Sequence, residues 1–158
     1  MIPNIISENH LKTLNLLIAT FDRQNIPYQV TGGLAGNIYG SKWPLHDIDI
    51  EVSQRDMAKV VELFKEYTVR PLFRLVDEEF DLMLLGLCLN DIEVEINQAE
   101  DAFIFSSGVR IKLDTDLSKA KKMRFLDLDI FVQPLDDIIN YKQLLNRNND
   151  VSDLINLK

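Results

Sequence analysis

Hydrophobic residues recur every three to four positions near the start of the chain and predict an amphipathic helix over residues 7–24. Ser7 is a favourable N-cap, and Asn25 and Pro27 end the pattern. The segment PYQVTGG indicates a short buried strand followed by a tight turn, and LAGNIYGS is long enough for a short helix. The chain is therefore expected to begin helix, strand, helix.

Acidic and apolar residues alternate over residues 46–52, which predicts another strand. Successive side chains of a strand point to opposite faces, so Asp47, Asp49 and Glu51 share one face and apolar residues cover the other. An acidic row of this kind is commonly just a solvated sheet face. Glu51 lies furthest along that face and is expected to be a bystander.

A second amphipathic helix is expected after this strand. Ser53 and Asp56 form a variant of the capping box at its start, and the apolar stripe ends near Tyr67. Three strands follow in RPLFRLV, FDLMLLGLCL and IEVEIN, and Asn90 with Asp91 suits a tight hairpin between the last two. The middle of the chain is therefore mostly β-structure.

The last third of the chain predicts further strands and then helices. Residues 99–124 contain a short strand or two with a lysine-rich connection, in which KAKK reads as a solvated loop, and FLDLDIFV predicts one strand. Pro134 opens a helix, and a short terminal helix covers about residues 151–157. The whole pattern predicts one α/β (α+β) domain, residues 1–158, with a mixed, twisted sheet, helices mainly on one face and short C-terminal helices.

The composition supports a single globular domain and argues against one class of binding partner. The chain has 158 residues, 46% hydrophobic and 27% charged, and its net charge of -8 argues against binding to long duplex DNA. The N-terminus lacks a targeting pattern, and no apolar run approaches the length of a membrane span. Cys88 is the only cysteine, so no disulfide framework exists. We expect a cytoplasmic protein.

Two carboxylates at positions i and i+2 of a strand can reach the same divalent cation. Mg²⁺ prefers oxygen ligands and commonly binds one or two carboxylates together with substrate phosphates. A third carboxylate from a neighbouring strand would complete such a site, and IEVEIN offers Glu93 and Glu95 on one face. Gly32 and Gly33 stand between a strand and a helix, where backbone N–H groups can hold phosphate oxygens.

Other polar residues have simpler interpretations. His46 is expected to point to the helix-covered face in a structural role, and His10 is expected to be exposed. Asp127 and Asp129 repeat the Asp-x-Asp pattern, but no glycine turn and helix precede them, so the first pair is preferred as a site. Lys142 lies on the expected helix after Pro134, where a lysine is commonly solvated.

The stretch TGGLAGNIYGSKWPLHDIDIEV resembles the signature of the DNA polymerase β-like nucleotidyltransferase superfamily. That signature is a Gly-Gly or Gly-Ser pair at a helix start, followed by Asp-x-Asp on the next strand. The tail PLDDIINYKQLLNRNNDVSDLINL is similar to small bacterial members, including relatives of antibiotic and toxin-antitoxin nucleotidyltransferases. The resemblance implies that Gly32 and Gly33 contact the nucleotide triphosphate and that Asp47 and Asp49 bind Mg²⁺.

The resemblance also implies a third carboxylate on a later strand that helps to activate the acceptor hydroxyl. Glu95 is preferred over Glu93, because VEI best matches the hydrophobic-acid-hydrophobic core of that strand. Many relatives carry an arginine a few residues before the first aspartate. Here Lys42 and Trp43 occupy that region, so Lys42 is a candidate phosphate contact, and Lys142 is another.

The function implied is transfer of a nucleoside monophosphate from an NTP to a hydroxyl acceptor with release of pyrophosphate, and ATP is the expected NTP. Mg²⁺ is the expected cofactor, and the acceptor is a small molecule, a protein or an RNA end. The alternative is a noncatalytic, antitoxin-like protein of the same fold that binds a nucleotide or a partner.

Overall fold

The computed structural model describes residues 5–158, so the start of the N-terminal segment that lacks a targeting pattern lies outside the described residues. The helices are α1 (Glu8–Arg23), α2 (Gly32–Tyr39), α3 (Gln54–Leu63), α4 (Leu135–Leu144) and α5 (Asn148–Ile155). The strands are β1 (Tyr28–Thr31), β2 (Ile48–Val52), β3 (Thr68–Val76), β4 (Phe80–Leu89), β5 (Ile92–Gln98), β6 (Phe103–Ser106), β7 (Val109–Lys112), β8 (Lys121–Phe125) and β9 (Leu128–Val132).

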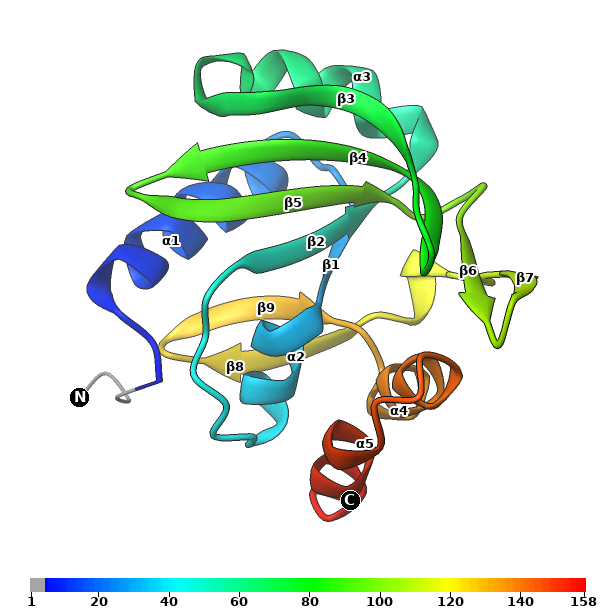
Figure 1. Cartoon of the computed structure of the whole chain (residues 1–158). Helices are drawn as coiled ribbons and strands as arrows, with labels where there is room; N and C mark the ends of the chain where they lie inside the picture. The colour runs from blue at the N-terminus through cyan, green and yellow to red at the C-terminus, as the bar shows by residue number, and fades with distance from the viewer. Residues whose placement is uncertain (1–4) are drawn as a thin grey trace.

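All strands of the described chain belong to one mixed, twisted sheet (Figure 1). Its order is β7-β6-β4-β5-β2-β1-β9-β8, and β3 pairs with β4 outside this path. β2 runs parallel to β5 and β9 runs parallel to β1, whereas the other neighbours are antiparallel. The α/β class with a mixed, twisted sheet that the sequence predicted is confirmed, while the treatment of residues 1–158 as one domain stays a prediction.

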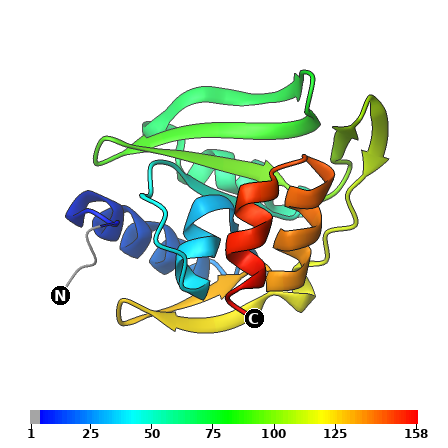
Figure 2. The same cartoon turned by 60° about the horizontal axis from the view of Figure 1, so that its bottom comes forward.

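The apolar face of β2 forms the centre of the core. Ile48, Ile50 and Val52 are fully buried and belong to one cluster with the inner faces of α1 and α3, the helices behind the sheet in Figure 1. Figure 2 shows α2, α4 and α5 beside one another on the other side of the molecule. Burying one face of β2 in this way turns Asp49 and Glu51 towards the opposite face.

The histidines differ from their expected positions. His10 is buried, with 7% of its surface exposed, because it completes a capping box with Ser7 at the start of α1. Its Nε2 also forms a 2.7 Å hydrogen bond with the carbonyl oxygen of His46. His46 lies before β2 and is exposed rather than covered by a helix. The pair of interactions ties α1 to the loop that leads into β2.

Several local predictions are confirmed and others are wrong. Asn90 and Asp91 form the β4–β5 turn with φ values of 51° and 63°, as a two-residue hairpin requires. Ser53 makes no capping hydrogen bond within α3, since its Oγ donates to Glu100 Oε2 at 2.7 Å. α3 ends at Leu63, before the expected end at Tyr67, and a 3-10 turn fills the remainder.

The segment FLDLDIFV is not one strand, because Leu126 and Asp127 adopt positive φ values and form the turn between β8 and β9. The segment KAKK is also only partly a loop, because its last two lysines are the first residues of β8. Asp129 pairs with Arg124 across this hairpin, N–O 3.2 Å. Among residues 5–158, no helix combines the length and apolar character needed to cross a membrane.

Candidate active site

The parallel pairing of β2 with β5 brings two carboxylates side by side. Asp49 stands directly opposite Glu95, and the two carboxyl groups are close enough to influence each other's pKa. Asp47 lies immediately before β2, exposed at the same end. Glu93 is two residues earlier on β5, is exposed and precedes the first residue that pairs with β2. Register therefore brings Asp49 together with Glu95 rather than with Glu93.

This carboxylate pair is short of positive charge. Burial raises the pKa of Asp49 well above its usual range, and the nearby charges of Glu95 and Asp47 raise it further. Burial also raises the pKa of Glu95. A divalent cation would neutralise the repulsion, and an oxygen-only donor set suits Mg²⁺. The chemistry of Asp47, Asp49 and Glu95 thus fits a magnesium site, although no three carboxylates of the described residues are already gathered into a preformed one.

Gly32 is the point at which the backbone comes closest to this pair. Its φ is +63°, and a Cβ added there would collide with Asp49 Oδ2 and lie 3.1 Å from Asp49 Cγ. A side chain at Gly33 would meet only Leu45 Cδ1, at 3.8 Å. α2 begins at Gly32, and the N-cap Thr31 makes no side-chain capping bond. The first N–H groups of α2 are therefore free of a capping side chain beside Asp49, as binding of an anion requires.

The two candidate lysines have different environments. Lys142 is buried, with 6% of its surface exposed, which differs from the solvated position common for helical lysines. Its Nζ pairs with Asp150 at 3.0 Å and lies 5.3 Å from the centre of the Trp43 ring. Its charge also lowers the pKa of Asp49, so it acts on the carboxylate pair. Lys42 is exposed in the loop between α2 and β2.

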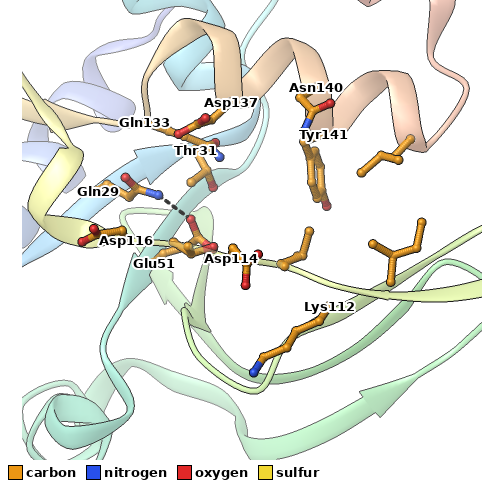
Figure 3. A pocket seen from close by; sticks show the side chains of 14 residues that line it. Gln29, Thr31, Glu51, Lys112, Asp114, Asp116, Gln133, Asp137, Asn140 and Tyr141 are labelled. Carbon is orange, nitrogen blue, oxygen red and sulfur yellow. Dashed lines mark hydrogen bonds between the residues drawn. The ribbon is translucent and has the colours of Figure 1, made fainter.

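A cavity of about 380 Å³ is lined by residues of β1, β2, the segment after β7 and α4 (Figure 3). Glu51, which was expected from the sequence to have no role in a site, lines this cavity together with Gln29 and Tyr141. Burial raises the pKa of Tyr141, and the charges of both Glu51 and Asp49 raise it further, so this side chain lies near both groups. The signal in the sequence is a glutamine, Gln29, inside the buried strand YQVT.

Gln29 and Glu51 are opposite each other in the β1–β2 register, and Gln29 Nε2 donates to Glu51 Oε1 at 2.7 Å. Burial raises the pKa of Glu51 to about 7, and the charge of Glu100 adds to this, whereas the hydrogen bond from Gln29 opposes it. The folded protein therefore holds a proton on Glu51 at pH values where the unfolded chain has released it.

The raised pKa of Glu51 predicts that the stability of the folded protein depends on pH. Because the folded-state pKa is above the ordinary value near 4.5, the free energy of unfolding should fall as pH rises from about 4.5 to about 7. Glu51→Gln should remove this part of the dependence, about 1–3 kcal/mol at pH 8 in metal-free buffer. Urea unfolding at pH 5 and pH 8 measures it. Equal pH slopes for the variant and the parent protein would refute the prediction.

The comparisons with known proteins concern the family and the fold of the chain. The family model for aminoglycoside-2''-adenylyltransferase matches residues 13–112. That range contains α2, β2 and β5, which carry the glycine turn and the carboxylate pair. No curated protein gives a significant match to this sequence.

Three solved structures share the fold. A protein from Thermotoga maritima described as a nucleotidyltransferase has a TM-score of 0.70 and 22% identity, with 92% of this chain and 91% of that chain covered. The lincosamide antibiotic adenylyltransferase LnuA, bound to lincomycin, gives 0.63 and 14%, with 97% and 99% covered. ANT(2")-Ia in complex with adenylyl-2"-tobramycin gives 0.61 and 12%, with 90% and 86% covered.

The family match, together with the shared fold, defines a protein of the nucleotidyltransferase class. The family match covers well over half of the chain, and the chain belongs to the aminoglycoside-2''-adenylyltransferase family. It is a nucleotidyltransferase enzyme, as the sequence signature implied.

Proposed function

We propose that this enzyme transfers a nucleoside monophosphate from an NTP, ATP in the first instance, to a hydroxyl group of a small molecule and releases pyrophosphate. The observation that carries the proposal is the pairing of Asp49 with Glu95 beside the backbone of Gly32. Lincomycin and adenylyl-2"-tobramycin in two structures of the same fold support a small-molecule acceptor over a protein or an RNA end. The cytoplasm, where NTPs are available, is the expected compartment.

Asp47, Asp49 and Glu95 would hold Mg²⁺, which supplies charge neutralisation for the phosphates when it is bound. The N–H groups of Gly32 and Gly33 at the start of α2 bind the phosphate oxygens. Their positions beside the carboxylates orient the α-phosphorus for attack, and such positioning provides most of the catalysis in phosphoryl transfer.

In the transfer step, the acceptor oxygen forms a bond to the α-phosphorus and the bond between that phosphorus and the pyrophosphate oxygen breaks. Glu95 accepts the proton of the acceptor hydroxyl, and the electron pair of the broken bond leaves with pyrophosphate. Lys142 lies near Asp49 and Lys42 lies in the adjoining loop, so we assign both to the charge balance around the phosphates.

Binding of ATP tests the metal assignment directly. Calorimetric titration with ATP should show binding that depends on Mg²⁺, and the double change Asp47→Asn with Asp49→Asn should abolish it because the metal loses two carboxylates. Asp127→Asn with Asp129→Asn removes the same charge from the second Asp-x-Asp pattern, at the β8–β9 hairpin, and serves as the control. Undiminished ATP binding by the first double variant would show that these aspartates do not hold the metal.

The two glutamates of β5 should behave differently. Glu95→Gln is expected to lower the transfer rate by about 10–100-fold, because a general base and charged ligand is lost. Glu93→Gln changes the charge equally at an exposed position that precedes the paired segment, and it should stay within about threefold of the parent rate. Single-turnover rates of pyrophosphate release distinguish them. The reverse order of effects would assign the third carboxylate to Glu93.

A further inference from the structure

Four neighbouring strands each contribute one residue to a single row across the sheet. Asp49 on β2 pairs with Glu95 on β5, which in turn pairs with Gly86 on β4. Gly86 pairs on its other side with Arg70 on β3. Figure 1 shows β2, β5, β4 and β3 next to one another in this order. Because directly paired residues point to the same face of a sheet, Arg70 stands in line with the carboxylate pair.

Gly86 leaves open the space between Arg70 and Glu95. A Cβ added to Gly86 would lie only 2.9 Å from the Cβ of Arg70, closer than two side chains pack. The β3–β4 register also shifts on both sides of Arg70, between Thr68 and Arg70 and between Arg70 and Phe73. Irregularities of this kind aim a side chain away from its place in the regular ladder. Arg70 therefore lies over the position at which any other residue of β4 would carry a side chain.

The residues next to Arg70 restrict its backbone and its side chain. Pro71 follows directly, and the residue before a proline is held in extended conformations. The guanidinium carbon lies 5.3 Å from the centre of the Phe73 ring, within the range of a cation–π contact. Phe73 packs in turn against the buried residues Leu82 and Leu84 of β4. The guanidinium group is thus anchored on one side, although Arg70 as a whole is exposed.

The charge of Arg70 acts on Glu95 and is not used in a salt bridge. It lowers the pKa of Glu95, which opposes the effect of burial. Within the described part of the chain, Arg70 forms no salt bridge with any carboxylate. Lys142 acts in the same sense on Asp49. One cation therefore influences each carboxylate of the pair, from β3 on the side of Glu95 and from α4 on the side of Asp49.

We propose that Arg70 is a positioning residue of the transfer reaction: across the space left by Gly86, its guanidinium group orients the carboxylate of Glu95 towards the acceptor hydroxyl. This inference rests on the proposed transferase function. Gly32, where the nucleotide phosphates are expected, approaches Asp49 at the other end of the row. Arg70 therefore acts on the acceptor side of the reaction and not on the nucleotide. Arginine suits this role, because it stays charged at every working pH and its planar group donates with fixed geometry.

Steady-state kinetics separates this role from nucleotide binding. Arg70→Ala should lower kcat about tenfold and leave KM for ATP within about threefold, because the lost charge lies beyond Glu95 and not at the phosphates. Initial rates of labelled-product formation, at rising ATP concentrations with Mg²⁺ and a protein-free extract of small molecules, give both constants. Arg70→Lys keeps the charge and should restore kcat to within about threefold of the parent value. A raised KM with unchanged kcat, or two unchanged constants, would overturn the proposal.

Two further variants test the geometry. Arg55→Ala removes the same charge from an exposed position on α3 and should leave both constants unchanged. Gly86→Ala keeps the arginine but displaces it by collision, so kcat should fall about three- to tenfold. In the Arg70→Ala background no guanidinium group is left to displace, and Gly86→Ala should change kcat less than about twofold. Effects of the two changes that simply multiply would show that Gly86 does not act through Arg70, contrary to the proposal.

The metal-free protein tests the same interaction without any reaction. Arg70→Ala should lower the midpoint of urea unfolding at pH 8, and this shift should be less than about half as large in the Glu95→Gln background. Equal shifts in both backgrounds would contradict the proposed interaction. No labelled product from the parent protein with any NTP would contradict the transferase function, while the unfolding shifts would still report on Arg70. Equal product formation by the parent protein and Arg70→Ala, with none by Asp49→Asn, would contradict only the role of Arg70.

Discussion

Asp49→Asn is expected to reduce nucleotidyl transfer by about 10²–10³-fold or more. Asp49 is the residue that β-sheet register places against Glu95 and that lies closest to the backbone of Gly32. An amide cannot supply the negative charge that a metal requires. Pre-steady-state formation of nucleotidylated product, with folding checked by circular dichroism, measures the loss.

The same change should stabilise the metal-free protein. Burial and the charges of Glu95 and Asp47 raise the pKa of Asp49, so the ionised carboxylate is unfavourable in the folded state at pH 8. A neutral amide removes this cost, and we expect the free energy of unfolding to rise by about 1–3 kcal/mol. Lower activity with higher stability is typical of a functional carboxylate.

Asp127→Asn provides the matched control, since Asp127 begins the second Asp-x-Asp pattern of the chain. It lies exposed in the β8–β9 turn with φ 63°, a conformation that asparagine adopts readily. Its activity and stability should both stay close to the parent values. An equal loss of activity in both variants would contradict the assignment of the first aspartate pair.

Gly32→Ala is expected to combine a loss of stability with a loss of activity. The new Cβ would adopt a left-handed conformation and collide with the carboxylate of Asp49. The backbone strain costs about 1–2 kcal/mol, and the collision adds to it, so we expect at least about 2 kcal/mol in total. Displacement of Asp49 by about 1 Å would lower the transfer rate on the order of 10²-fold. Chemical denaturation and initial rates measure the two effects.

Substitutions at two other glycines separate the effect of backbone strain from the effect of the collision with Asp49. Gly108→Ala has the same kind of strain, φ +80°, but no atom within 4 Å of the new Cβ, so it should cost only about 1 kcal/mol and leave the activity unchanged. Gly33→Ala has ordinary φ and only an ordinary contact with Leu45, so its stability should change by less than about 0.5 kcal/mol. If Gly32→Ala lowered the stability and the transfer rate no more than Gly108→Ala does, the close packing of Gly32 against Asp49 would contribute to neither.

Much of the fold was predictable because local signals agreed with the tertiary structure. The period of the first helix, its cap at Ser7 and the Asn90–Asp91 hairpin each correspond to an observed element. The proximity of Asp49 and Glu95 was also predictable in outline, since alternation assigns each carboxylate to one face. Sheet register then decides between Glu95 and Glu93, and register depends on long-range pairing that composition does not encode.

The remaining features depend on contacts between distant segments. The turn at Leu126 and Asp127 contains no glycine or proline. Its sequence therefore looks like the interior of a strand in which apolar and polar residues alternate. His10 is buried because the loop before β2 crosses α1. Glu51 looked like the outer end of a solvated row, but β1, the segment after β7 and α4 enclose it. Only the assembled sheet shows that its neighbour is the buried Gln29.

The central claim is that this chain transfers a nucleoside monophosphate to a small hydroxylated acceptor. The most direct measurement is incubation of the pure protein with NTPs labelled at the α-phosphorus, Mg²⁺ and a protein-free extract of small molecules. The claim predicts a labelled product and an equal amount of pyrophosphate, both absent with Asp49→Asn and both lost when the metal is chelated. No labelled product from any of the four NTPs, or a product formed equally well by Asp49→Asn, would contradict it.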